Sequence, residues 1–567
     1  MASDGRDSAT APMRPGDERN LDTNDSDISE LLPRLEKSCQ VRDTLFDEVL
    51  RGLQNDAQLR PKLMALEVLR RSIYAHYAEG EYQDDVGKIL TKEDTDRLIA
   101  PQDIERYIIK PLITGAFNAN NAIRCECAKV IHAVTACLPM KEYKSILTAE
   151  TFRGVLLLME YVCGNRNKSK LEREMWNASV YTIRNLVTFV DISSEAIGQA
   201  LTCVCRKHDA ASVDFCQAVL LCHLFPKLEE NGLINMYTYA PGSMAYTTRV
   251  IIKYLVELLA NAQDYEVLSK VCDTFVAVCE YSFGVDLILE ANCLPHIMRL
   301  ALLVAFSYER ALAAMNDIYD YAAGARLREA ITPQMHHISF EALTVISKIA
   351  FTAHRRQIMA LLEIGTAGVM VKMLNCPASS SLVKTRASNV LGNIGCETEA
   401  EVQIIVNSDA MPALVRTFQK ALEENEKIEA AYAICACAAK ANRRQVGYIV
   451  SCTSRYNSYG SNNCMALVCD MMDLICKSDP CTEGNVRLCR VVLNALENIL
   501  VIGIAEAKDH RLLENPYGRL FLEHGGATKL AKMATFPDFE IAKRAVFISQ
   551  MFFNFPTVWA HTNCDCR

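Results

Sequence analysis

The chain has 567 residues and a formal net charge of −8 at pH 7, and a chain of that length forms several domains or one elongated stack of repeats rather than a single globular core. Half of the residues are apolar while Gly (24) and Pro (17) are sparse, which favours helices with short connections over an α/β enzyme with glycine-rich loops. The negative charge excludes a domain-wide basic field, so we expect no direct contact with nucleic acid.

Residues 1–35 are polar and poor in apolar side chains, which predicts a disordered acidic tail. Residues 1–50 hold 12 Asp and Glu against 6 Lys and Arg, and no two basic residues are adjacent. The opening MASDGRDSATAPM contains no apolar signal segment. No run of 18 apolar residues follows, so we expect no membrane insertion.

From residue 36 to 553, apolar residues recur at intervals of three and four, which predicts helices almost throughout. Clear examples are LMALEVLRRSIYA (63–75) and RVVLNALENILVIG (490–503). Turn signals separate such segments: CGNRNKSK (163–170), APGS (240–243), NCPASS (375–380) and KSDPCTEGN (477–485).

The helical text repeats itself as two helices followed by a longer third helix. Examples of the third helix are SFEALTVISKIAF (339–351), TRASNVLGNIG (385–395) and KIEAAYAICACAA (427–439). The equivalent positions Thr344, Asn389 and Tyr432 are 45 and 43 residues apart, a period of the armadillo and HEAT repeats. Two stretches break the period: we predict an inserted helical arm over 302–335 and an exposed loop over 451–463.

The first two helices of a repeat are joined by a small or turn-prone pair of residues. Four segments carry this link: LILEANCLPHIMRL (287–300), LLEIGTAGVMVKML (361–374), IIVNSDAMPALVRTF (404–418) and FLEHGGATKLAKM (521–533). A repeat of this kind buries its apolar faces only against its neighbours. The predicted fold is therefore all-α: a right-handed superhelical solenoid of about ten armadillo repeats over residues 36–553, with the third helices on the concave side.

The 24 cysteines lie in helical text such as DFCQAVLLCHLF (214–225), so we interpret them as reduced core thiols of a cytosolic or nuclear protein. The Cys-x-Cys pairs at 125/127, 203/205 and 435/437 point about 200° apart on a helix and do not chelate one metal. His561, Cys564 and Cys566 in the C-terminal tail, residues 554–567, are too few for a zinc site. We predict no metal, and no cofactor.

No nucleotide-binding, nucleophile-elbow or metalloprotease motif stands in the context that its chemistry needs. We therefore predict that the chain is not an enzyme.

Two features resemble importin-alpha, the nuclear-import adaptor. One is the third-helix pattern of EMWNASVYTIRNLV (174–187); the other is the stretch ALENILVIGIAEAKDH (495–510) with the following NPYGRLFLEHGGATKLAKMATFPDFEIAKRA (515–545). The resemblance is closest over 338–553 and covers ten candidate repeats over 55–553. It implies a concave groove in which Trp rings form slots for Lys and Arg side chains, while Asn amides hold an extended peptide backbone.

On this resemblance, the peptide-binding residues are Tyr181 and Asn185 in the third repeat, Asn389 and Asn393 in the seventh, and Glu429 and Tyr432 in the eighth. The family pattern is eroded. Tyr replaces Trp at 181, Asn389 stands where Trp is expected, and Ala436 replaces Asn. In the sixth repeat, Lys348 would repel a basic peptide. The groove therefore binds basic peptides more weakly or reads a different peptide.

The resemblance implies proteins with basic nuclear localisation peptides as partners, shuttling between cytoplasm and nucleus, and an export receptor docked at the C-terminal repeats. The family's basic importin-beta-binding segment is absent from residues 1–50, so we expect no importin-beta binding through the tail and an open groove in the free protein. The alternative is an armadillo scaffold for protein assembly that has lost recognition of localisation signals.

Overall fold

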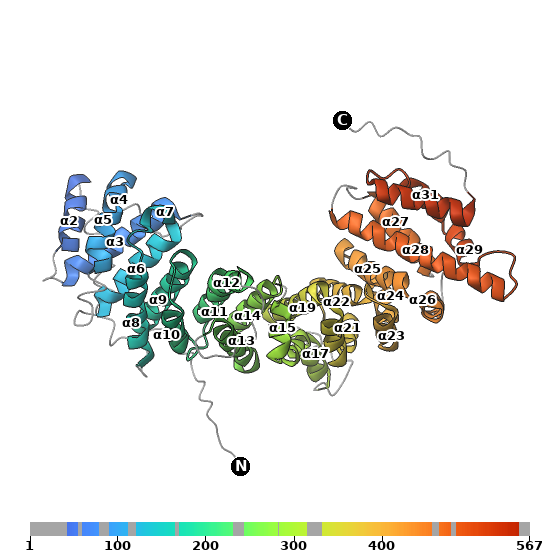
Figure 1. The fold of residues 1–567 in the computed structure, drawn as a ribbon, viewed down its shortest axis with the longest axis horizontal. Helices are drawn as coiled ribbons and strands as arrows, with labels where there is room; N and C mark the ends of the chain where they lie inside the picture. The colour runs from blue at the N-terminus through green and yellow to red at the C-terminus, as the bar shows by residue number, and fades with distance from the viewer. Residues whose placement is uncertain are drawn as a thin grey trace, which may run out of the picture. The chain divides into compact units, whose positions relative to one another are not determined.

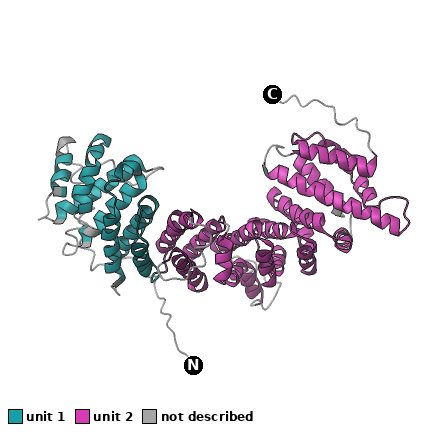
Figure 2. Ribbon diagram, viewed as in Figure 1, with its two compact units in different colours: residues 1–207 teal, residues 208–567 magenta. Residues whose placement is uncertain are grey.

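The computed structural model describes residues 42–54, 59–78, 90–110, 121–164, 169–230, 243–281, 283–313, 331–455, 464–477 and 483–554. Every regular element in these ranges is a helix (Figure 1). The chain divides into two compact units, residues 1–207 and 208–567 (Figure 2). The predicted acidic tail, 1–35, lies outside the described residues, as does almost all of the predicted C-terminal tail.

The first unit is built on three long helices, α3, α6 and α9, that pack side by side in chain order. Helix α2 covers α3, and α8 packs against both α9 and α10. The helices of this unit are α2 (Arg42–Gln54), α3 (Leu59–Tyr77), α4 (Lys92–Leu98), α5 (Pro101–Ile104), the π-helix η1 (Glu105–Ile109), α6 (Asn121–Cys137), α7 (Met140–Tyr143), α8 (Ala149–Gly164), α9 (Lys170–Phe189) and α10 (Ser194–Val204).

The second unit continues with the same kind of repeat. Its first part comprises α11 (Ala210–Ala218), η3 (Val219–Leu224), α12 (Phe225–Glu230), α13 (Met244–Asn261), α14 (Tyr265–Val278), α15 (Gly284–Glu290), α16 (Leu294–Ala301), α17 (Leu303–Ala313) and α19 (Pro333–Thr352). Its second part comprises α20 (Arg355–Glu363), α21 (Thr366–Asn375), α22 (Ser381–Gly395), α23 (Glu399–Asn407), α24 (Ala410–Lys420), α25 (Glu424–Lys440), α26 (Arg443–Arg455), α27 (Cys464–Lys477), α28 (Glu483–Asp509), α29 (Pro516–Glu523), α30 (Gly526–Met533) and α31 (Phe539–Phe553).

The triplets α20–α21–α22, α23–α24–α25, α26–α27–α28 and α29–α30–α31 each have two helices followed by a third. The third helices α14, α19, α22, α25, α28 and α31 each pack against the next. Second helices also stack on one another, as α16 does on α21 and α21 on α24. The prediction of an all-α helical solenoid with armadillo-like repeats is confirmed.

The link between the first and second helix turns sharply because one residue adopts left-handed backbone. At all four predicted links this residue is present: Asn292 (φ 54°), Gly365 (φ 82°), Asp409 (φ 60°) and Gly525 (φ 72°). Gly, Asn and Asp are the residues that enter this region at least cost. The predicted turn-prone pairs are thus where the chain reverses within each repeat.

Helix α22 packs closely on α25 because glycine faces the partner helix. A Cβ atom on Gly392 would lie 2.6 Å from the ring of Tyr432, and one on Gly395 would lie 2.5 Å from Cys437 Sγ. Residues Ala430–Ala438 of α25 are buried almost throughout, since α22, α24 and α28 all pack on this helix. Small side chains therefore set the distance between these repeats.

The two predicted interruptions are partly described. An additional helix, α17, stands between α16 and α19, within the predicted arm. The start of the predicted loop over 451–463 is wrong, because α26 continues to Arg455. Serine is unfavourable inside a helix, but the Ser451 hydroxyl donates a hydrogen bond to the Tyr448 carbonyl, which accommodates Ser451 in α26. Residues 456–463 lie outside the described residues.

Within the described ranges, one helix, Gly484–Asp509, is long and apolar enough to cross a membrane, and half of its apolar window is buried inside the structure. A bent pair, Arg355–Glu363 with Thr366–Asn375, passes the same test only when its two halves are counted together. Helix α28 packs against α25, α27 and α31. A core helix with several neighbours needs this apolarity for packing alone.

The cysteines whose state the structure gives form no disulfide, and most of them are buried. Burial raises the pKa of the Cys125 and Cys127 thiols to about 12. These thiols are protonated at neutral pH and act as small apolar side chains, as the sequence predicted.

The left-handed link predicts opposite effects of two similar substitutions. Gly365→Ala forces a side chain into left-handed backbone and should lower the free energy of unfolding by about 1 kcal/mol. Gly368→Ala, three residues later in α21, should raise it by about 0.5–1 kcal/mol, because a helix interior prefers Ala. Neither new Cβ meets an atom within 4 Å, so backbone conformation alone separates the two. Urea unfolding measures both; equal signs would contradict the link geometry.

Candidate functional site

Four of the six predicted peptide-binding residues come together in the second unit. Asn389 and Asn393 lie one turn apart on α22, and Glu429 and Tyr432 lie almost one turn apart on α25. A groove of about 280 Å³ is lined by Asn389, Glu429 and Tyr432 together with Arg487 of α28. The sequence pattern therefore identified one real groove between three consecutive third helices.

The asparagine amides in this groove are engaged within the protein. Asn389 donates from Nδ2 to Glu429 Oε2 at 2.8 Å, and its Oδ1 accepts from the Ser347 hydroxyl and from Asn393 Nδ2. Asn393 Nδ2 also lies 3.4 Å from the Ser347 carbonyl oxygen. These bonds connect α19, α22 and α25, so the amides stabilise the stacking of repeats.

The slot beside Tyr432 holds an arginine of the same chain. Arg487 donates from Nη2 to Asn393 Oδ1 at 3.0 Å and to the Tyr432 hydroxyl at 2.6 Å. Its guanidinium lies 4.9 Å from the centre of the Tyr432 ring and 5.2 Å from that of Phe351. Two aromatic faces and an amide oxygen are the surroundings that a guanidinium prefers. The groove that we expected to be open is filled here by Arg487.

The Tyr432 hydroxyl accepts a hydrogen bond from the Arg487 cation. Its side chain is only 5% exposed; burial and the neighbouring Cys396 thiol raise its pKa well above the ordinary value, although Arg487 acts in the opposite direction. The phenol therefore stays protonated at neutral pH. The sequence did not point to Arg487 because its contact with Asn393 spans 94 residues. In the sequence, Arg487 is one charged residue near the start of a helix and belongs to no motif.

The neighbouring third helices α14 and α19 add acidic groups. Lys348, which we expected to repel a basic peptide, forms an ion pair with Glu280 at 2.8 Å and is thereby neutralised. Glu341 hydrogen-bonds to Asp273; burial first, and then this second carboxylate, raise the pKa of Glu341 above its ordinary value. A cation placed beside two adjacent carboxyl groups would favour their charged forms.

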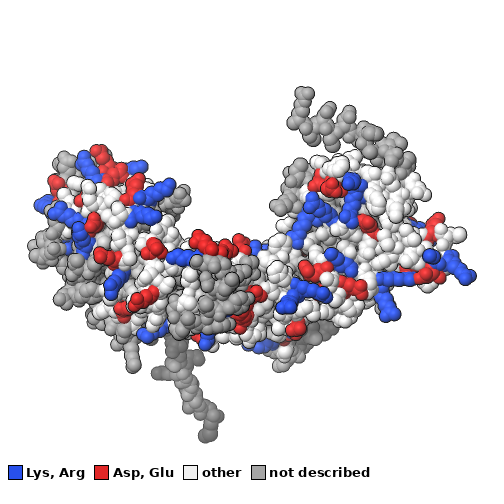
Figure 3. All heavy atoms as spheres, viewed as in Figure 1, with Lys and Arg blue, Asp and Glu red and all other residues white. Residues whose placement is uncertain are grey.

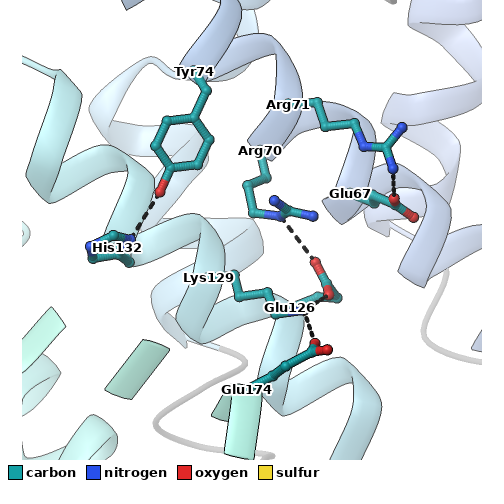
Figure 4. A network of polar contacts seen from close by, with 8 residues as sticks. All are labelled: Glu67, Arg70, Arg71, Tyr74, Glu126, Lys129, His132 and Glu174. Carbon is teal, nitrogen blue, oxygen red and sulfur yellow. Dashed lines mark hydrogen bonds and ion pairs between the residues drawn. The ribbon is translucent and has the colours of Figure 1, made fainter. Parts of the chain in front are cut away.

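The predicted slot in the first unit has a different environment. The Tyr181 ring packs on the His132 imidazole, with 5.6 Å between centres, and Asn185 Nδ2 donates to the Thr135 hydroxyl at 3.0 Å. His132 Nδ1 is in turn 2.9 Å from the Tyr74 hydroxyl (Figure 4). Tyr74, His132 and Tyr181 form an aromatic ladder across α3, α6 and α9.

Charged residues run beside this ladder on the same three helices (Figure 4). Lys129 of α6 bonds to Glu126 at 2.8 Å and to Glu174 of α9 at 2.6 Å, and Arg70 of α3 reaches Glu126 at 3.4 Å. The structure thus pairs these charges within the unit. Tyr181 and Asn185 belong to the first unit and the other four predicted residues to the second, so they are two separate candidate sites.

Three asparagines of the third helices share one role. Asn498 Nδ2 donates to the carbonyls of Ala438 and Ala441 at 2.8 and 2.9 Å, as Asn185 and Asn393 donate to the third helix before their own. Each amide donates to an oxygen atom of the neighbouring helix that packing would otherwise leave without a hydrogen bond. The recurrence of Asn in the repeats thus has a structural cause as well as a candidate binding role.

Within the residues that the structure describes, no group of three His, Cys, Asp or Glu side chains could hold a metal ion. The tail residues His561, Cys564 and Cys566 lie outside these ranges.

No protein-family model matches the chain, and no curated protein matches it significantly. An engineered protein of known crystal structure matches 88% of this chain and 97% of its own, with 15% identity and a TM-score of 0.54, and this likeness shows the fold alone. A designed armadillo repeat protein covers 52% of this chain and 97% of its own, and another, in complex with the peptide (KR)4, covers 53% and 99%. Both have 18% identity and TM-scores of 0.37, too low to support an argument.

The aromatic ladder predicts acid sensitivity of the first unit. Burial first, and then Arg184 and Arg70, lower the pKa of His132 from 6.5 to about 4. Between pH 6.5 and about 4, His132 binds a proton in the unfolded chain but stays neutral in the folded chain. The free energy of unfolding is therefore highest above pH 6.5 and falls towards pH 4, by up to about 3 kcal/mol. His132→Gln does not titrate and should flatten this loss.

The measurement is urea unfolding at pH 7 and about pH 4.5, followed by Trp176 fluorescence in a Trp559→Phe background. Trp176 lies buried in α9 and reports on the first unit. An identical acid loss in the wild type and in His132→Gln would show that His132 does not cause it.

Proposed function

We propose that this chain is a receptor for extended basic segments of partner proteins, which lie along the third helices of the second unit. One observation carries the proposal: the slot of Tyr432, Phe351 and Asn393 holds an arginine side chain. A slot that accepts Arg487 has the chemistry to accept an arginine of a partner. Glu429, whose carboxylate lines the same groove, supplies a negative charge beside it.

The acidic groups of α14 and α19 support the same proposal. Asp273 is exposed on α14, and Glu341 of α19 hydrogen-bonds to it. Figure 3 shows acidic side chains gathered over α12 and α14. A lysine or arginine placed beside Asp273 and Glu341 would form an ion pair, a gain that a neutral ligand does not offer.

The more specific form of the proposal is nuclear import. The third-helix pattern and the segment 495–545 resemble importin-alpha, which suggests that the basic segments are nuclear localisation signals. On this proposal the protein shuttles between cytoplasm and nucleus, an export receptor docks at the C-terminal repeats, and cargo is carried without importin-beta binding through residues 1–50.

A second candidate function is an assembly scaffold without peptide recognition. The observation in its favour is that the amide groups of Asn185, Asn389 and Asn393 all hydrogen-bond to neighbouring helices. These amides could hold the backbone of a bound peptide only if their present hydrogen bonds were broken. In the scaffold, Arg487 is a permanent clamp between repeats.

Replacing Arg487 separates the two functions. In a receptor, Arg487 competes with the ligand for the slot, so Arg487→Gln should tighten binding of a short labelled Lys/Arg peptide about fivefold, measured by fluorescence anisotropy. The same substitution should lower the urea midpoint, since Tyr432 and Asn393 lose their cation. Arg487→Lys keeps a cation in the slot and should bind like the wild type. Absence of binding in all three proteins would favour the scaffold.

Proton release provides an independent check of the receptor. A bound cation lowers the raised pKa of Glu341, so binding expels a proton and affinity should rise with pH above the ordinary carboxyl value of 4.5. Calorimetry in two buffers with different ionisation enthalpies measures the proton count. Glu341→Gln should abolish the pH dependence; an unchanged pH profile in this variant would place the peptide elsewhere.

A further inference from the structure

We propose that the groove between α28 and α31 binds an acidic segment of a partner protein that carries an aromatic or aliphatic residue. This site is separate from the slot of Arg487 and has the opposite charge preference. It lies wholly within the last two repeats of the second unit.

The groove has a volume of about 660 Å³ and is lined by both helices. Its charged lining consists of three cations, Arg490, Lys543 and Arg544, and two carboxylates, Glu497 and Glu540. A volume of this size accommodates several side chains of an extended segment.

The cations of this groove are only partly neutralised. Arg544 is paired with Glu497, since its Nε and Nη2 both donate to Glu497 Oε2, at 3.1 and 2.6 Å. Arg490 reaches Asp538 at 3.5 Å but keeps 59% of its side chain exposed. Lys543 forms no ion pair among the described residues, and its Nζ lies 5.8 Å from the centre of the Phe539 ring. Arg490 and Lys543 therefore have donors left for an external carboxylate.

Apolar surface lies directly beside these cations. Phe539, Phe547 and Met551 are 72%, 47% and 61% exposed. Together with Lys543 they stand at intervals of four along α31, so they form one stripe of that helix. Large exposed side chains in a row beside charged groups are typical of an interaction surface.

Charge complementarity selects the occupant. Figure 3 shows Lys and Arg side chains gathered over the C-terminal helices, in contrast to the acidic side chains over α12 and α14. A basic segment would meet Arg490 and Lys543 with like charge, whereas Asp or Glu would complete their hydrogen bonds. The apolar stripe adds a place for one Phe or Leu of the same segment.

The test uses the full-length protein and a fluorescein-labelled peptide of alternating Asp and Glu with two central Phe residues. Fluorescence anisotropy should show binding that weakens with salt and is at least tenfold tighter than that of the same peptide with neutral Asn and Gln in place of the acidic residues. Lys543→Glu should weaken the acidic peptide about tenfold, because an attraction becomes a repulsion. Phe547→Ser should weaken it about fivefold.

The matched control is Lys532→Glu, which makes the same charge change in the same repeat but on α30, outside the groove; it should change affinity less than about twofold. Circular dichroism and urea midpoints confirm that the variants fold. Equal binding of the acidic and neutral peptides, or equal effects of the two Lys variants, would overturn the proposal. So would a gain in affinity on deleting residues 555–567, since the chain's own C-terminal residues would then be the occupant.

Discussion

The side-by-side packing of third helices is the constraint on which the rest of the second unit depends. At Gly392 and Gly395 there is no room for a side chain between α22 and α25, so the two helices stand at one fixed distance. That distance brings Asn389 within 2.8 Å of Glu429 and sets the Tyr432 ring against α22. The groove is thus a result of close packing, because the distance between the two helix backbones places its polar groups.

Polar side chains between the repeats serve two ends at once. An amide that crosses from one third helix to the next satisfies buried polar groups, and in the same place it can contact the side chain that occupies the slot. Asn393 does both, since it is 6% exposed and bonded to α19, yet also contacts Arg487. Binding a peptide at such a position therefore competes with stability, and this competition defines the choice between receptor and scaffold.

Much of the fold could be predicted from the sequence because it rests on local patterns. Helical periodicity, a repeat of about 43–45 residues and the turn-prone pairs at Asn292, Gly365, Asp409 and Gly525 are all visible within one repeat. The convergence of Asn389, Asn393, Glu429 and Tyr432 also followed, since equivalent positions of stacked repeats become neighbours. The occupation of the slot by Arg487, the neutralisation of Lys348 by Glu280 and the pairing of Tyr181 with His132 depend on contacts between residues 49 to 94 positions apart, which no local pattern encodes.

Arg487 also bears on how this solenoid can evolve. Its side chain bridges α28 and α22 across the intervening α25, so three repeats depend on their present order. Repeat proteins commonly grow and shrink by duplication or loss of whole units, because each unit contacts only its neighbours. Here the duplication or loss of a repeat between residues 396 and 482 would separate Arg487 from Asn393. The contacts of Arg487 therefore oppose a change in the number of repeats in this part of the chain, since such a change would remove them.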